Sequence, residues 1–174
     1  MSRPLLAVVF ASKRELEGKA RAAAVLPLLL GKSALELALD AAAGPKPEKV
    51  WALPETEKAD LSRLRTLLGK RPAENIVILD SRYPLVSRRS LRSLLHFHQK
   101  NRNVLTKMKA GFGGREVDPG VFVFRRKDFV AARDDIANRQ KKACSLVAVV
   151  RALAGRKQNT GVYPCPRPEE ALAV

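Results

Sequence analysis

The feature that most constrains the fold is a continuous apolar run near the N-terminus, Leu5–Ala11, with the sequence LLAVVFA. Because successive side chains of a strand point to opposite faces, a strand is apolar throughout only where both faces of its sheet are covered. Largely apolar runs follow at Lys49–Leu53, Asn75–Leu79 and Val121–Phe124. Helical patterns separate these runs, and this alternation is typical of βαβ units. We therefore expect an α/β fold of three layers, Rossmann-like, around a mostly parallel sheet.

Between the expected strands, apolar residues recur at helical spacing and capping residues mark the ends of helices. Leu35, Leu39 and Ala42 share one face of a helix that Gly44 and Pro45 terminate. The other expected elements are a helix Leu61–Leu68 with Asp60 as its candidate cap, a helix from Ser87 or Ser90 to about Lys100, helices Lys127–Ile136 and Cys144–Leu153, and a last edge strand Gly161–Cys165. At 174 residues, the chain suits a single domain that spans residues 1–174.

The net charge is strongly positive and unevenly distributed. It is +16 for the whole chain, and residues 81–174 hold 20 Lys and Arg against 7 Asp and Glu, a balance of +13. This bias predicts nucleic acid or another polyanion as a partner, while a basic proteome or an acidic protein partner is the alternative. No apolar run has the length of a membrane span, and no signal peptide is expected. The predicted location is therefore cytoplasmic, without a membrane partner.

One segment carries many cations with no acid between them. It extends from Arg82 to Lys109, from the turn after a strand through the next helix. Ligands of open α/β sheets gather outside the carboxyl ends of the strands, where the start of this segment is expected. We predict an anion- or nucleic-acid-binding surface made of Arg82, Arg88, Arg89, Arg92, Lys100, Arg102, Lys107 and Lys109. The alternative is an ordinary solvated helix face. A second acid-free set comprises Arg139, Lys141, Lys142, Arg151, Arg156 and Lys157.

Three stretches occur in the order used by one enzyme family. Val25–Ala42 (VLPLLLGKSALELALDAA) is close to V-L-x-P-L-x-G-K-P-x-L-E followed by a helix. Ile76–Ser87 (IVILDSRYPLVS) matches V-L-V-L-x-G-D-x-P-L-I-S, and Glu116–Phe124 (EVDPGVFVF) matches E-x-N-x-G-x-Y-V-F. In these motifs the chain resembles the N-terminal domain of N-acetylglucosamine-1-phosphate uridyltransferase and related sugar nucleotidyltransferases, although it is much shorter. The resemblance implies a nucleotidyltransferase fold.

The resemblance also shows which parts of the nucleotide site are replaced. The family's phosphate-binding signature A-A-G-x-G-T-R falls on residues 11–17, where neither glycine nor the arginine is kept. Without glycine the backbone loses its close approach to phosphate, and the glutamates repel the ligand. The degenerate nucleotide site expected here comprises Lys13, Arg14, Glu15 and Glu17. The segment between Asp60 and Ile76 is also too short for the family's base-recognition loop.

The metal-binding positions of the family are altered in the same way. The carboxylate of the G-D-x-P turn falls on Arg82, and a guanidinium does not ligate Mg²⁺. Asp80 lies two residues earlier and so points to the same face, where it pairs with Arg82 or, less plausibly, replaces the lost ligand. The family's second metal residue falls on Asp118, which keeps an oxygen ligand. Asp80 and Asp118 are therefore weak metal candidates.

These substitutions favour a catalytically degenerate nucleotidyltransferase-like protein that binds nucleic acid or another polyanion through its basic surface. No catalytic residue and no cofactor are expected on this interpretation. The first alternative is a residual sugar-phosphate nucleotidyltransferase that uses Asp80, Asp118 and Mg²⁺. The second is a regulatory or scaffold subunit of an active homologue, with a protein partner.

Other candidate residues favour structural roles. His96 and His98 point to different faces of their helix and make no metal pair. The glycine-rich stretch Gly111–Gly114 is interpreted as a hairpin tip rather than a phosphate cradle, since it does not open a helix after a strand. Cys144 is expected in the core.

Overall fold

The computed structural model describes residues 4–11, 33–54, 62–69, 73–112, 115–140, 144–155 and 159–171. Within these residues, seven strands form one sheet. Six of them follow the order β2-β1-β3-β6-β4-β5, and the seventh, β7, pairs with β4 along the edge opposite β6. The strands are β1 (Leu5–Ala11), β2 (Lys49–Pro54), β3 (Asn75–Asp80), β4 (Leu105–Phe112), β5 (Arg115–Val117), β6 (Phe122–Arg125) and β7 (Thr160–Pro164).

The strand directions confirm a mostly parallel sheet with an antiparallel insertion. β1 pairs in parallel with β2 and β3, and β4 pairs in parallel with β7. β6 lies between β3 and β4 and is antiparallel to both. Because of this insertion, the start of β6 lies beside the carboxyl end of β3.

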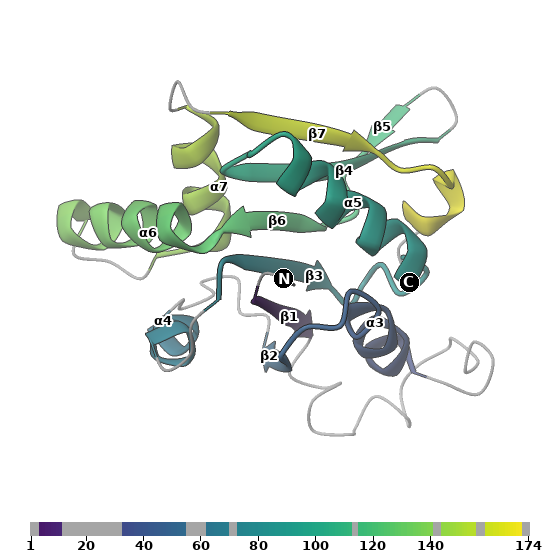
Figure 1. Cartoon of the computed structure of the whole chain (residues 1–174), viewed down its shortest axis with the longest axis horizontal. Coiled ribbons are helices and arrows are strands. Elements are labelled where there is room, and N and C mark those ends of the chain that lie inside the picture. Colours follow the sequence, from purple (N-terminus) through teal and green to yellow (C-terminus); the bar gives the residue numbers. More distant parts are fainter. Residues whose placement is uncertain are drawn as a thin grey trace.

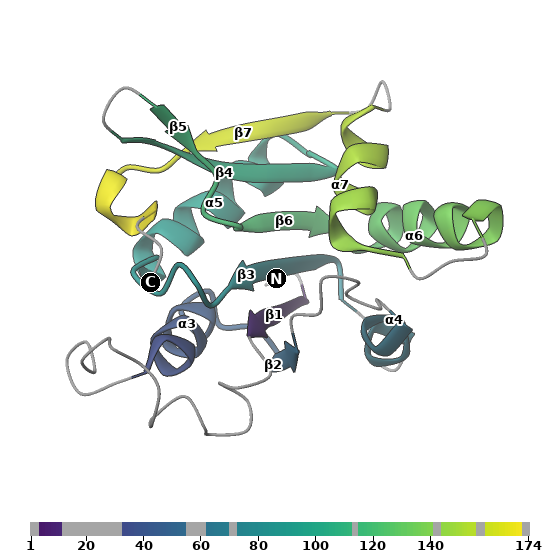
Figure 2. The same ribbon diagram turned by 180° about the vertical axis from the view of Figure 1, so that it is seen from behind.

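Helices cover both faces of the sheet. They are α3 (Ala34–Ala42), α4 (Ser62–Gly69), α5 (Arg88–Lys100), α6 (Arg126–Gln140) and α7 (Leu146–Ala154), and a short 3₁₀ helix, η1 (Pro168–Ala171), lies near the C-terminus. Alternate residues of β1 belong to two separate apolar clusters, one shared with α4, α6 and α7 and the other with α3 and α5. Figure 1 shows α5 in front of the sheet, and Figure 2, from behind, shows α7 in front of it. The three-layer α/β architecture is confirmed.

Local capping chemistry explains where the helices begin. Ser33 and Glu36 form a capping box at the start of α3, in which the Ser33 hydroxyl accepts the Glu36 N–H and the Glu36 carboxylate accepts the Ser33 N–H. Ser87, rather than Ser90, caps α5 by accepting the Ser90 N–H at 3.1 Å. Asp60, the candidate cap of α4, lies outside the described residues.

The structure adds elements that the sequence patterns did not predict. β4 was not expected, although its side chains alternate in burial, with Thr106, Met108 and Ala110 buried and the lysines between them half-buried. With β5 it forms the antiparallel hairpin expected around Gly111–Gly114. α6 also continues beyond Ile136 to Gln140, and α7 begins at Leu146 rather than Cys144. None of the described helices has the length and apolar character that crossing a membrane requires.

Candidate functional site

A cavity of about 440 Å³ lies at the carboxyl ends of β1 and β3, on the side of the sheet where α7 packs. This is the position at which open α/β sheets bind ligands. The cavity is lined by Phe10, Ile78, Leu79, Asp80, Arg82, Tyr83, Lys107, Asp118, Gly120, Phe122, Ser145, Leu146, Val147, Val150 and Arg151. It therefore combines an apolar surface with five charged side chains.

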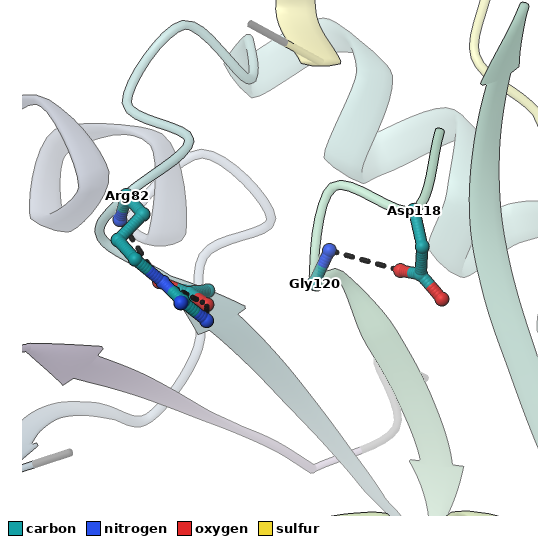
Figure 3. A network of polar contacts seen from close by, with 4 residues as sticks. Arg82, Asp118 and Gly120 are labelled. Carbon is teal, nitrogen blue, oxygen red and sulfur yellow. Dashed lines mark hydrogen bonds and ion pairs between the residues drawn. The ribbon is translucent and has the colours of Figure 1, made fainter. Parts of the chain in front are cut away.

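Asp80 and Arg82 form a closed ion pair at one end of the cavity. The Arg82 Nε donates to both Asp80 carboxylate oxygens, at 3.0 and 2.9 Å, and a terminal guanidinium nitrogen lies 2.5 Å from Oδ2. The Arg82 backbone N–H also donates to Asp80 Oδ1 at 2.9 Å. Figure 3 shows the Arg82 side chain folded back over the end of β3. Of the two alternatives for Asp80, the structure places it in the pair with Arg82.

Asp118 approaches the same cavity from the loop before β6. Its Oδ1 accepts the Gly120 backbone N–H at 2.9 Å (Figure 3). Gly120 has a φ of 62°, and a Cβ at this position would lie 2.7 Å from the Asp80 Cβ. Only glycine tolerates both the backbone conformation and this approach. Asp80 and Asp118 are thus brought to one cavity from positions 38 residues apart in the sequence.

The donor set does not fit a magnesium ion. Mg²⁺ takes six oxygen ligands in a regular octahedron, supplied by one or two carboxylates together with waters and substrate phosphates. Here both oxygens of Asp80 already accept the Arg82 guanidinium, and one oxygen of Asp118 accepts a backbone N–H. Among the described residues, no group of three His, Cys, Asp or Glu side chains could hold a metal ion.

Two further cations line the cavity and form no ion pair with any carboxylate of the described residues. Lys107 projects from β4 and is half-buried, whereas Arg151 is exposed on the second turn of α7. Ser145, which also lines the cavity, caps α7 by accepting the Ala148 N–H at 3.2 Å. In the sequence, Arg151 belongs only to an acid-free set, and no motif marks Ser145 as a site residue. No spacing in the sequence relates α7 to β3, because their contact arises from tertiary packing.

The eight cations of the predicted basic surface fall into separate places. Arg82 and Lys107 line the cavity, and Lys109 pairs with Glu116 at 3.5 Å. Arg88 holds α3 against α5, since its Nε donates to the Asp40 carbonyl at 2.9 Å and its guanidinium lies 3.9 Å from the Asp40 carboxylate. Arg102 is exposed in the turn after α5.

The remaining members of the predicted surface share one face of α5. Arg89, Arg92 and Lys100 are all exposed, and His96 is exposed between them. Their spacing of three, four and four residues keeps them on one side of a helix. We call these four residues the α5 basic stripe. None of its arginines or lysines pairs with a carboxylate of the described residues, and α5 itself contains no acid.

Several other predictions are confirmed, and one set of residues cannot be placed. His98 is 2% exposed while His96 is exposed, so the two histidines do point to different faces. Cys144 is buried, and burial raises the pKa of its thiol. The degenerate nucleotide site Lys13, Arg14, Glu15 and Glu17 lies outside the described residues.

A three-layer α/β architecture of this topology, with a cavity at the carboxyl edge of its sheet, defines a Rossmann-like α/β protein. No model of a protein family matches the sequence, and no curated protein matches it. Solved structures do match. The chain superimposes on 4-diphosphocytidyl-2C-methyl-D-erythritol synthase from Anaerococcus prevotii with a TM-score of 0.72 at 12% identity, over 99% of this chain and 92% of that one.

Two further structures show the same likeness. 2-C-methyl-D-erythritol 4-phosphate cytidylyltransferase from Thermus thermophilus has a TM-score of 0.62 at 16% identity, over 96% of this chain and 91% of that one. CMP:2-keto-3-deoxy-manno-octonic acid synthetase, solved with CTP, has a TM-score of 0.57 at 13% identity, over 92% and 89%. At these identities the likeness establishes the nucleotidyltransferase-like fold alone. The particular resemblance to N-acetylglucosamine-1-phosphate uridyltransferase stays a prediction.

Proposed function

We propose that this protein is a catalytically degenerate member of the nucleotidyltransferase fold that binds nucleic acid through the α5 basic stripe. The observation that carries the proposal is the stripe itself, a row of exposed cations without acidic neighbours on its helix. Arg89 and Lys100 are eleven residues apart, or about 16 Å along a helix that rises 1.5 Å per residue. This length is comparable to about five phosphates along one strand of a duplex, which are spaced by 3.4 Å.

Electrostatics at the start of α5 favours an anion further. Arg88 and Arg89 lie in the first turn, where the backbone N–H groups and the helix dipole already present positive charge. Surface helices normally place acidic residues there. Arg88 is engaged by Asp40 of α3, and the buried Glu170 accepts the Ser90 hydroxyl in the same turn. Arg89 is therefore the exposed arginine of this turn that forms no ion pair among the described residues and can attract a phosphate backbone.

The proposed loss of transferase activity rests on changes at the metal-binding position and in the phosphate-binding signature. Arg82 neutralises Asp80 in the cavity, and the sequence places Glu15 and Glu17 where the family has a glycine and an arginine. No cofactor is required by this function. The proposed location is the cytoplasm, where a soluble nucleic-acid-binding protein of this charge meets its ligand.

Fluorescence anisotropy with labelled duplex DNA, duplex RNA and single-stranded RNA tests the proposal. We expect binding whose affinity falls steeply with salt, because neutralised phosphates release counterions. The Arg89→Glu/Arg92→Glu variant should weaken binding by about 10- to 100-fold at low salt. Lys127→Glu/Arg139→Glu is the matched control, since it makes the same charge change at exposed positions of α6.

The control separates the stripe from the overall charge. If both double variants lose affinity equally, binding follows net charge and the α5 stripe is not the interface. If no nucleic acid binds at low salt, the proposal is wrong, and an acidic protein partner or the regulatory-subunit alternative takes its place.

The residual transferase is the competing function, because the structure brings Asp80 and Asp118 to one cavity. Release of pyrophosphate from a nucleoside triphosphate with Mg²⁺, abolished in Asp80→Ala, would establish it. We expect no release, and no rise in melting temperature when triphosphate and Mg²⁺ are added together.

A further inference from the structure

The floor of the cavity is a row of side chains across neighbouring strands. Ile78 of β3 pairs with Phe122 of β6, and Phe122 pairs with Lys107 of β4. Residues directly opposite each other in adjacent strands project to the same face, so these three side chains lie side by side. All three line the cavity. The floor is therefore apolar at one end and cationic at the other.

The wall of the cavity is one face of α7. Val147, Val150 and Arg151 follow a spacing of three and one residues along this helix, and all three line the cavity. Val147 is 58% exposed, so this part of the wall is open to solvent. Like the floor, the wall therefore consists of an apolar surface with one cationic side chain.

The charges of the cavity leave a net positive potential after the internal pairing. Arg82 and Asp80 neutralise each other. The other charged residues of the lining are Lys107, Arg151 and one carboxylate, Asp118, and neither cation forms an ion pair among the described residues. Cations without partners beside an apolar cavity favour a ligand that supplies an anion.

We propose that this cavity binds a small phosphomonoester with an apolar or planar body, and that it does so without a divalent metal. Lys107 and Arg151 hold the phosphate, while Phe122, Val147 and Val150 pack against the body of the ligand. The Arg82 guanidinium stands at the position where the related motif has a metal carboxylate, and its pairing with both oxygens of Asp80 keeps that carboxylate from a metal ion. This site is separate from the α5 basic stripe, because α5 and α7 pack against opposite faces of the sheet.

Isothermal titration of the full chain with phenyl phosphate, in EDTA and again in Mg²⁺, tests the proposal. We expect saturable binding in EDTA that Mg²⁺ does not strengthen. Inorganic phosphate, which lacks the apolar body, should bind at least about 10-fold more weakly, as expected for the lost burial of an aromatic ring. Phenol, which lacks the anion, should show no binding.

Two variants locate the site. Arg151→Ala should weaken phenyl phosphate binding by about 10-fold or more, the loss expected for one charge-assisted hydrogen bond. Arg139→Ala, which removes one exposed arginine from α6, is the matched control and should bind as the unmodified chain does. Because Lys107 lies in a central strand, Lys107→Met, which keeps the length of the side chain, is checked for folding by circular dichroism before titration.

The outcomes separate this site from the proposed nucleic-acid interface. Arg89→Glu/Arg92→Glu should lose nucleic acid and keep phenyl phosphate, whereas Arg151→Ala should do the reverse. Binding that requires Mg²⁺, binding that survives Arg151→Ala unchanged, or no binding at all would each overturn the inference.

Discussion

At the scale of single residues, burial in the core keeps the imidazole of His98 in its neutral form. His98 is 2% exposed, and its Nδ1 lies 2.9 Å from the Thr106 hydroxyl oxygen. The Asn103 side-chain amide donates to the same hydroxyl oxygen at 3.0 Å. Burial lowers the pKa of His98 to about 4, and the nearby Arg125 adds to the shift. The neutral imidazole therefore belongs to the folded state, while the unfolded chain protonates near the ordinary value of 6.5.

This difference predicts a loss of stability in acid. Between pH 6.5 and 4 the unfolded state binds a proton that the folded state does not, so the free energy of unfolding falls as the pH falls through this window. His98→Gln should remove up to about 3 kcal/mol of that fall, the amount expected when folding lowers a pKa from 6.5 to about 4. Urea unfolding at several pH values measures it. His96→Gln, on the exposed side of the same helix, should leave the pH dependence unchanged, and an equal effect of both changes would contradict the prediction.

At the scale of elements, β7 is held against α5 and β4 by a close approach at one glycine. A Cβ on Gly161 would lie 2.2 Å from the Asn103 side-chain nitrogen and 3.0 Å from a ring carbon of Phe97. The neighbouring Tyr163 ring packs on Phe97 with centroids 5.5 Å apart. The last strand therefore packs closely enough that one added methyl group must displace its neighbours.

The Gly161→Ala variant should accordingly lose stability. We expect about 1–3 kcal/mol, the usual cost of forcing an extra methyl group into a packed region. Gly111→Ala is the matched control, since a Cβ on that strand glycine meets nothing within 4 Å. Midpoints of urea unfolding compare the two, and an unchanged midpoint for Gly161→Ala would show that β7 is not packed as described.

The first turn of α5 contacts an acidic residue from a distant element of the chain. Glu170 of η1 is 2% exposed, and its Oε1 accepts the Ser90 hydroxyl at 3.0 Å in the first turn of α5. It provides the negative charge that this turn lacks in its own sequence. Because Glu170 is buried, the α5 basic stripe keeps its uniform charge at the surface.

At the scale of the whole molecule, the net charge of +16 is the dominant electrostatic property. Like charges at this density repel one another in the compact state, and salt screens the repulsion. We expect the melting temperature of the free protein to rise as sodium chloride is increased from low to moderate concentration. Differential scanning fluorimetry measures this, and the Lys127→Glu/Arg139→Glu variant should respond less steeply. A melting temperature that falls with salt would indicate that favourable ion pairs dominate instead.

Much of the fold was predictable because its signals are local. The continuous apolar run of β1, the capping serines, and the spacing of Leu35 and Leu39 are readable from neighbouring residues, since helices and strands repeat over a few positions. β4 escaped prediction because its lysines at positions 107 and 109 extend the acid-free run of cations from the preceding helix, although their alternation with buried residues is itself typical of a strand. The strand order was not predictable in detail, since the insertion of β6 between β3 and β4 is a non-local pairing.

The candidate site divides in the same way. The sequence by itself determined that Arg82 stands two residues after Asp80, so that the two side chains meet at the end of one strand. Only the tertiary structure decided that Asp118, Lys107 and Arg151 join them around one cavity, and that Arg88 holds α3 while Arg89 and Arg92 face solvent. The physical reason is that a strand or helix is specified by contacts a few residues apart, whereas a cavity is formed by distant elements whose packing buries the apolar faces of both.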